Sequence, residues 1–300
     1  MFKMSEYSFI AGVLTVALAL ACYLVAFLSV RVASRRAGLT AAGAGAGGGT
    51  VTDSRSGSPG LSLGTYGTLL TYLALAFLTA SLLFRTVATG HGPFANMYEF
   101  SIAFAWGTLA MYLYFERRYQ QRALGLVALP IALLMLLYAL TIPATIDPLV
   151  PALQNNLLLS VHVAVAIVAY GTFTVAFASA ILYLVQGENG RRGLPSRELL
   201  DEISYKAVMV GFPFLTLTIV LGAVWAEVAW GRYWGWDPKE TASLVTWLIY
   251  GSYLHARVVR GWRGERAAYL LILGFVAVLF TYFGNLFFGG LHSYGGLNQG

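Results

Sequence analysis

The residue type with the clearest chemical potential in this chain is histidine, which occurs four times, as His91, His162, His255 and His292. A neutral imidazole binds iron strongly, and one imidazole on each face of a haem makes its iron six-coordinate. His162 and His255 lie within long apolar runs, whereas His91 and His292 lie in glycine-rich segments. If the fold brings two of these side chains together, they predict a site for haem iron.

A tryptophan-rich segment, at about 225–242, is the second notable feature. It holds four of the seven tryptophans within twelve residues: Trp225, Trp230, Trp234 and Trp236. Large aromatic side chains form rigid flat surfaces, and Gly231 and Gly235 allow close approach of the backbone. Tryptophan also gathers at membrane interfaces, which explains individual residues here but not the whole set. The segment therefore predicts a platform for a flat, planar ligand.

The end of this segment has the pattern of a helix start. Asp237 is expected at the N-cap, Pro238 at the first helical position and Glu240 at the third, which together make a capping box. Capping is favoured for Asp237 over a role as a general acid or base, although it lies beside the predicted platform.

Composition identifies the class of protein in which these residues must be positioned. The chain has 300 residues, of which 58% are hydrophobic and 11% charged, and its mean hydropathy is +0.69. These values predict an all-α integral membrane protein rather than a soluble domain. The net charge of +6 indicates basic loops on one side of a membrane, not a nucleic-acid partner. The single cysteine, Cys22, excludes dithiol chemistry by this chain alone.

Apolar runs predict about eight transmembrane helices. Their expected ranges are Tyr7–Val30, Leu63–Val87, Glu99–Phe115, Ala123–Ile142, Leu157–Gln186, Ala207–Val228, Thr241–Val258 and Ala267–Phe288. The third is the shortest and least distinct. The first has an acidic residue in place of a basic leader and no clear cleavage site, so it is interpreted as an anchor rather than a signal peptide.

The domain organisation follows from these helices. Residues 1–31 are expected to be an N-terminal anchor, and residues 32–62 a cytoplasmic linker rich in Gly, Ala and Ser. Residues 63–300 are expected to form a seven-helix body that carries the tryptophan-rich segment.

Lysine and arginine divide unevenly between the two sides of such a bundle. Fifteen of the 19 fall in the loops after the first, third, fifth and seventh helices, and the other side receives only Lys3, Arg85, Arg232 and Lys239. The positive-inside rule assigns the basic loops to the cytoplasm. Both termini and the tryptophan-rich segment are therefore predicted to face outward across the plasma membrane.

This topology sorts the histidines. His162 and His292 are both expected at the outer surface, where they can hold one haem axially beside the tryptophans; alternatively, each is satisfied by water or backbone. His255 is alone toward the inner end of its helix, so it either caps that helix end or binds iron with a ligand from elsewhere. His91 is interpreted as part of a turn with Gly90 and Pro93.

Two of the four outer basic residues, Arg232 and Lys239, flank the tryptophans. Both are candidate counter-ions for the carboxylates of haem propionates. The alternative is that they are solvated loop charges.

Several segments resemble one known family. The stretch Trp230–Thr241, with Tyr253–Arg257 after it, is similar to the tryptophan-rich "WWD" signature of the CcsA/ResC membrane subunit of system II cytochrome c biogenesis. The segments Gly90–Glu99 and Gly290–Gly295, and the helix around His162, resemble the same family. The resemblance covers roughly Leu63–Gly296 and leaves out the first helix and the linker.

The resemblance implies a haem-handling subunit of a holocytochrome c synthase, or haem lyase. It implies that His162 and His292 are external ligands of haem b, and that His255 is a transmembrane ligand whose opposite imidazole comes from a ResB-type membrane partner. Haem would enter from the cytoplasmic side and settle under the tryptophan-rich segment, for attachment to a Cys-x-x-Cys-His motif of apocytochrome c. A thiol-reducing partner is expected, since the acceptor cysteines must be reduced.

Three other functions remain as alternatives. A haem exporter would use the same ligands without an attachment step. A b-type electron-transfer protein would favour histidine pairs at two depths, which four histidines with one alone fit poorly. A transporter of another solute would favour inverted repeats and broken helices, and no convincing repeat is visible.

Overall fold

The computed structural model describes residues 1–43, 62–145, 153, 156–188, 190–191, 193–284 and 287–292. Every regular element within these residues is helical, as the composition predicts. In chain order the elements are α1 (Phe2–Gly43), α2 (Leu63–Thr89), α3 (Met97–Tyr119), the short 3₁₀ helix η1 (Arg122–Leu124), α4 (Gly125–Leu140), α5 (Asn156–Gln186), α6 (Arg197–Trp230), α7 (Pro238–Arg260) and α8 (Glu265–Phe283).

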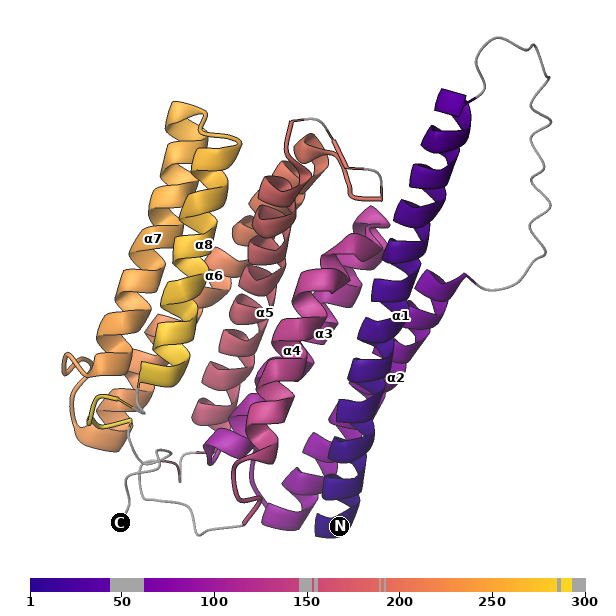
Figure 1. Ribbon diagram of the computed structural model, residues 1–300. Helices are drawn as coiled ribbons and strands as arrows, with labels where there is room; N and C mark the ends of the chain where they lie inside the picture. The colour runs from indigo at the N-terminus through magenta and orange to yellow at the C-terminus, as the bar shows by residue number, and fades with distance from the viewer. Residues whose placement is uncertain are drawn as a thin grey trace.

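The eight long helices lie side by side as a bundle (Figure 1). Helix α1 packs along α2, while α5 is central and contacts α3, α4, α6 and α8. The N-terminus, the end of α8 and the connection from α6 to α7 lie at one end of the bundle, and the α5–α6 and α7–α8 connections lie at the other (Figure 1). The tryptophan-rich segment is thus at the same end as the N-terminus, as expected, and residues 293–300 lie outside the described residues.

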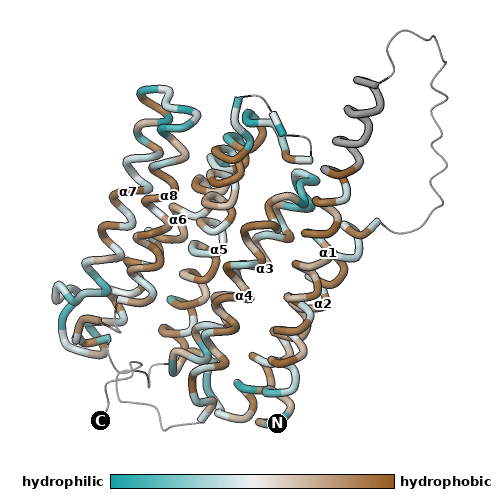
Figure 2. Tube along the Cα trace, viewed as in Figure 1, coloured by the Kyte–Doolittle hydropathy of each residue, from teal (hydrophilic) through white to brown (hydrophobic). Residues whose placement is uncertain are grey.

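Hydropathy along the chain supports a membrane protein. Apolar residues dominate the middle of the helices and polar residues gather at their ends (Figure 2). Among the described residues, six helical segments are long and apolar enough to cross a membrane: α1, α2, α4 with η1, α5, α6 and α8. Helices α3 and α7 are not among the six, and they have the most polar compositions of the eight.

Several boundaries differ from those predicted. Helix α1 continues to Gly43, so its last turns extend into the expected linker, and residues 44–61 lie outside the described residues. Helix α3, expected to be the shortest, has 23 residues, whereas α4 has 16. Helix α6 begins at Arg197 rather than Ala207, and α8 ends at Phe283 rather than Phe288.

The contact between α3 and α5 depends on two glycines. A Cβ atom on Gly171 would lie 2.6 Å from the carbonyl oxygen of Gly107, and one on Gly107 would collide with Ile167. Small residues let membrane helices approach closely where no hydrophobic force joins them. This contact holds the first half of α5 against α3, so that the two helices together form one wall of the site described next.

Candidate functional site

A cavity opens at the end of the bundle that carries the tryptophan-rich segment. Its space, including the opening to solvent, is about 1060 Å³, and its walls come from α3, α5, α6, α7, α8 and the segment after α8. Ligand pockets are lined mainly by apolar groups with a few polar ones. The polar and aromatic lining residues include His162, His292, Trp225, Trp234, Lys239 and Glu240.

His162 is fixed by the backbone of α6. Its Nδ1 atom lies 2.9 Å from the carbonyl oxygen of Thr218, and because a carbonyl oxygen only accepts, Nδ1–H is the donor. The approach requires glycine at position 222, where a Cβ atom would lie 2.8 Å from Cε1 of the imidazole. Gly222 thus leaves room for the ring directly beside the carbonyl that holds it.

His292 is fixed by Asp237. The imidazole Nδ1 lies 2.8 Å from Oδ2 of the aspartate, and the backbone N–H of Leu291 donates to Oδ1 at 2.6 Å. Asp237 also caps α7, since its side chain accepts from the backbone N–H of Lys239. One buried carboxylate therefore starts α7 and ties the segment after α8 to it. The predicted capping box is present, with Glu240 as its third-position partner.

Burial and hydrogen bonding set the protonation of this pair. Burial lowers the pKa of His292 below its usual value and outweighs the raising effect of Asp237. Burial alone would raise the pKa of Asp237, but the hydrogen bond from His292 and the backbone donors lower it. At neutral pH the pair is a neutral imidazole that donates Nδ1–H to an ionised carboxylate.

Both histidines line the cavity, and each has its Nδ1 atom engaged by the protein. In each ring Nδ1 is held by a hydrogen bond, so Nε2 carries the lone pair that can bind a metal. Histidines that ligate metals usually donate their other ring N–H to a carboxylate or a backbone carbonyl, which fixes the tautomer and the orientation of the ring. His162 has the carbonyl version of this arrangement and His292 the carboxylate version.

Trp225 joins the two histidines. Its ring is stacked on His162 with centroids 6.5 Å apart and an angle of 13°, and it lies 5.7 Å from the ring of His292. Trp230 meets both Trp225 and His292 edge-on, at 4.8 Å in each case. Trp225 is buried, and its indole N–H has no hydrogen-bond partner among the described residues.

The other two tryptophans extend this surface outward. Trp234 lines the cavity and meets Trp236 edge-on at 5.6 Å, while Trp236 is exposed. The carboxylate of Glu240 accepts from the backbone N–H groups of Gly235 and Asp237, which folds the chain tightly around Trp236. Trp236 has φ 56°, a left-handed conformation that is uncommon for a non-glycine residue.

The two candidate counter-ions differ in environment. Lys239 lines the cavity, and its Nζ lies 5.5 Å from the centre of the Phe100 ring. Burial lowers the pKa of Lys239 to about 8, and Asp237 raises it by less than burial lowers it. Arg232 is exposed outside the cavity, with its guanidinium against Gly235. The structure thus places Lys239, but not Arg232, on the cavity wall.

The remaining two histidines lie elsewhere. His255 is exposed on the outer surface of α7, and His91 lies in the turn before α3, where its Nδ1 contacts the carbonyl oxygen of Gly92 at 2.8 Å. Neither residue lines the cavity. The turn interpretation of His91 agrees with this position.

The groups that orient His162 are not predictable from the sequence. Thr218 acts through a backbone carbonyl, which no residue type reveals. Gly222 is an isolated glycine within an apolar helix, which is only a weak indication of a close contact. The walls of the cavity that come from α3 (Met97 and Phe100) were also missed, because apolar residues in a membrane helix have many possible neighbours.

Comparison with known proteins places these features in context. Residues 94–292 match the family described as "Cytochrome C assembly protein". The chain is similar to "Cytochrome c biogenesis protein CcsA" of Guillardia theta, with 40% identity over 76% of this chain and 85% of that protein. It is also similar to the proteins of the same name from Chlamydomonas reinhardtii (42%, over 74% and 66%) and Gloeothece citriformis (37%, over 78% and 88%).

Among solved structures, "Cytochrome c Heme Lyase CcmF" has a similar fold. The TM-score is 0.64 at 18% sequence identity, and the match covers 94% of this chain and 46% of CcmF. At this identity the likeness concerns the fold, and the chain spans less than half the length of CcmF.

Proposed function

The chain belongs to the cytochrome c assembly protein family and is a multi-pass membrane protein of cytochrome c biogenesis, and from this premise we propose that it is the haem-presenting subunit of a system II cytochrome c synthase. Haem b is its substrate. His162 and His292 hold the iron on the outer side of the plasma membrane, and the haem is then attached to a Cys-x-x-Cys-His motif of apocytochrome c.

The observation that carries this proposal is the matched pair of histidines. Two imidazoles from distant parts of the chain border one cavity, and each has its Nδ1 engaged by a protein acceptor. An iron held by four porphyrin nitrogens needs two further ligands at most, and two Nε2 atoms supply them. A haem so held would be stable until the histidine of the acceptor motif replaces one of them.

The rest of the cavity suits the rest of the haem molecule. The rings of Trp225 and Trp234 offer flat apolar surface, and Trp230 and Trp236 support them edge-on. Lys239 is a half-buried cation on the wall, and a propionate carboxylate brought against it would replace the hydration that burial removes. Arg232 is exposed at the rim, so it would contact only a propionate that extends out of the cavity.

The attachment reaction itself needs positioning more than acid–base chemistry. Each cysteine S–H of the acceptor adds across one haem vinyl group, forming one C–S bond and one C–H bond with no net oxidation. The protein contributes by holding the haem edge where the thiols can reach it. Because the thiols must be reduced and this chain has only Cys22, a thiol-reducing partner acts before this step.

The orientation is assigned by charge. The sequence assigns four basic residues to the end of the bundle with the N-terminus and the tryptophan-rich segment, and fifteen to the other side. The positive-inside rule then directs the cavity to the outer face. In this assignment residues 1–31 are the anchor, residues 32–62 a cytoplasmic linker, and residues 63–300 the haem-handling body.

His255 supports a second, shared haem position at the inner side. It lies on an exposed stripe of α7 with Val245, Leu248, Ser252 and Val259, whose spacing alternates between three and four residues, as in a helix–helix seam. A lone imidazole facing lipid is costly. A transmembrane helix from a ResB-type partner, carrying the opposite imidazole, would cover it.

His255→Ala is therefore expected to remove haem only from the complex. Protein purified with a ResB-type partner should lose about half of its haem, because one of two positions is disabled. Protein purified alone should keep its haem, because His162 and His292 are untouched. Haem-to-protein ratios from absorption spectra measure both, and an equal loss with and without the partner would refute the shared position.

The overall function is tested by co-expression. Cells without other cytochrome c synthases would express this chain, a ResB-type partner and an apocytochrome c with a Cys-x-x-Cys-His motif. We expect haem that stays on the cytochrome after denaturing electrophoresis, and none when this chain is left out. Haem outside the cells without covalent cytochrome would instead identify an exporter, and no haem in either form would refute haem handling.

A further inference from the structure

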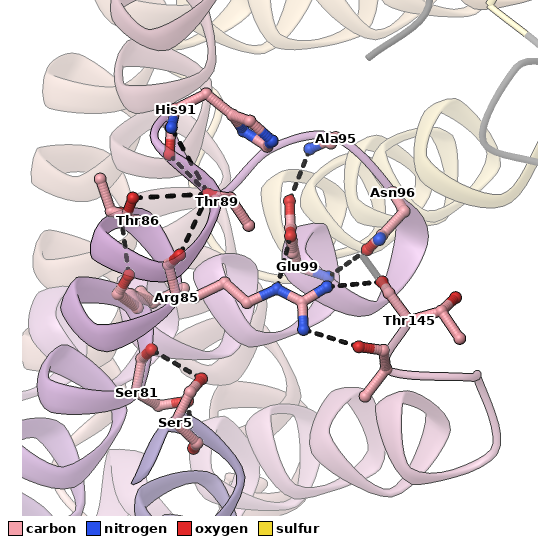
Figure 3. Close-up of polar contacts among 12 residues, drawn as sticks. Ser5, Ser81, Arg85, Thr86, Thr89, His91, Ala95, Asn96, Glu99 and Thr145 are labelled. Carbon is pink, nitrogen blue, oxygen red and sulfur yellow. Dashed lines mark hydrogen bonds and ion pairs between the residues drawn. The ribbon is translucent and has the colours of Figure 1, made fainter. Parts of the chain in front are cut away.

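A buried ion pair lies near the cavity but takes no part in the site described above. Arg85, near the end of α2, and Glu99, in the first turn of α3, are 2% and 1% exposed. Nε of Arg85 donates to Oε1 of Glu99 at 2.8 Å (Figure 3). Ionisable groups inside a membrane protein are costly to bury and are usually retained for function.

Arg85 uses its remaining donors to tie together distant segments. Its two terminal nitrogens donate to the carbonyl oxygens of Ala144 and Thr145, which follow α4, at 2.7 and 2.8 Å. The guanidinium also lies over the rings of Phe2 and Tyr98, at 5.4 and 5.3 Å. One side chain of α2 thus contacts α1, α3 and the residues directly after α4, and Figure 3 shows its bonds to Glu99 and Thr145.

Glu99 fixes the start of α3. Its Oε2 accepts from the backbone N–H of Ala95 at 2.7 Å, and its own N–H donates to the side chain of Asn96, the N-cap. In the first turn of α3, the carboxylate of Glu99 and the capping side chain of Asn96 therefore both have hydrogen-bond partners. The position of that turn is therefore set by the ion pair and not by apolar packing alone.

The turn that is fixed in this way forms part of the cavity. Met97 lies two residues before Glu99 and Phe100 directly after it, and both line the same cavity as the histidines. Phe94 and Ala95, like Trp230, pack against the smaller core that contains Trp225. Movement of the first turn of α3 would consequently move the wall that a ligand of His162 and His292 must touch.

We propose that Arg85 and Glu99 are positioning residues for haem: they lock the first turn of α3 and the approach to α5 so that Met97 and Phe100 keep their places in the cavity wall. This inference rests on the proposed function, since it concerns the same cavity. An ion pair serves this purpose better than apolar contacts because its hydrogen bonds fix direction as well as distance.

The test compares Glu99→Gln with Glu116→Gln. Glu116 is a second buried glutamate of α3, bonded to Tyr23 and Thr68 and about 26 Å away along the helix. Purified proteins would be compared by haem titration, thermal unfolding, and hydrogen exchange of the peptide 92–104. We expect Glu99→Gln to weaken haem binding by roughly tenfold, an effect that substitutions without contact to the ligand can have, and to speed exchange in that peptide. Glu116→Gln should do neither at equal loss of thermal stability.

The double variant Arg85→Gln, Glu99→Gln separates positioning from stability. With no unpaired charge left, its thermal stability should recover toward that of the wild type, while haem binding stays weak and exchange in 92–104 stays fast. If haem binding recovers together with stability, or if Glu99→Gln binds haem normally, the pair is only structural. If the wild type binds no haem at all, the proposed function fails, and the exchange rates still decide whether the pair holds this wall.

Discussion

Replacing either His162 or His292 with alanine is expected to abolish the low-spin absorption band of haem in the purified protein. Each substitution removes one of two axial ligands, and the remaining imidazole leaves the iron five-coordinate and high-spin. The two variants should behave alike although the residues lie on different elements, because each Nε2 supplies one of the two bonds. Absorption spectra of the reduced proteins measure the effect.

His91→Ala is the matched control for these variants. His91 lies at the same end of the bundle, but its ring contacts the backbone of its own turn, so its removal should leave the low-spin band intact. Free imidazole added to His162→Ala or His292→Ala should restore the band in part by occupying the space of the lost ring. A low-spin band that survives in either variant would show that another residue ligates the iron.

Asp237→Ala is expected to produce two separate losses. Removal of the N-cap of α7 should destabilise the protein by about 0.5–2 kcal/mol. Removal of the acceptor for His292 should weaken haem binding by about 10- to 100-fold, as for other groups that orient a metal ligand. Thermal unfolding measures the first loss and haem titration the second.

Ser196→Ala separates the two effects. Ser196 caps α6 at the opposite end of the bundle, where its hydroxyl oxygen accepts from the backbone N–H of Leu199. This variant should lose a similar amount of stability and bind haem like the wild type. Equal haem binding by Asp237→Ala and Ser196→Ala would mean that Asp237 acts as a cap and does not hold His292.

Local sequence patterns predict the features of this structure that depend on interactions between residues close together in the sequence. The capping box at Asp237 and Glu240 formed as expected, because its atoms belong to adjacent residues. The all-α bundle and the common end of the N-terminus and the tryptophans follow from the apolar runs. These features need no knowledge of which helices touch.

Contacts between distant segments were not predictable in the same way. The sequence predicts Asp237 as a helix cap. Its second role, as the hydrogen-bond acceptor for His292, depends on the fold that brings His292 to it. The sequence predicts Arg85 as an outer basic residue. Its position within an apolar run is the indication in the sequence that Arg85 is buried with a partner. The predicted range of α3 ends too early, at Phe115. Glu116 continues the helix because Tyr23 and Thr68 bury it, and these residues belong to two other helices.

The fastening of His292 to Asp237 also has a consequence for biogenesis. The two candidate ligands are separated by α6, α7 and α8, so the second arrives only after each of these helices has been inserted and has turned back. A chain with a missing or inverted helix would deliver one imidazole to the cavity at most. Occupancy by low-spin haem would then serve as a natural quality check, distinguishing correctly threaded molecules from misassembled ones before any acceptor protein is engaged.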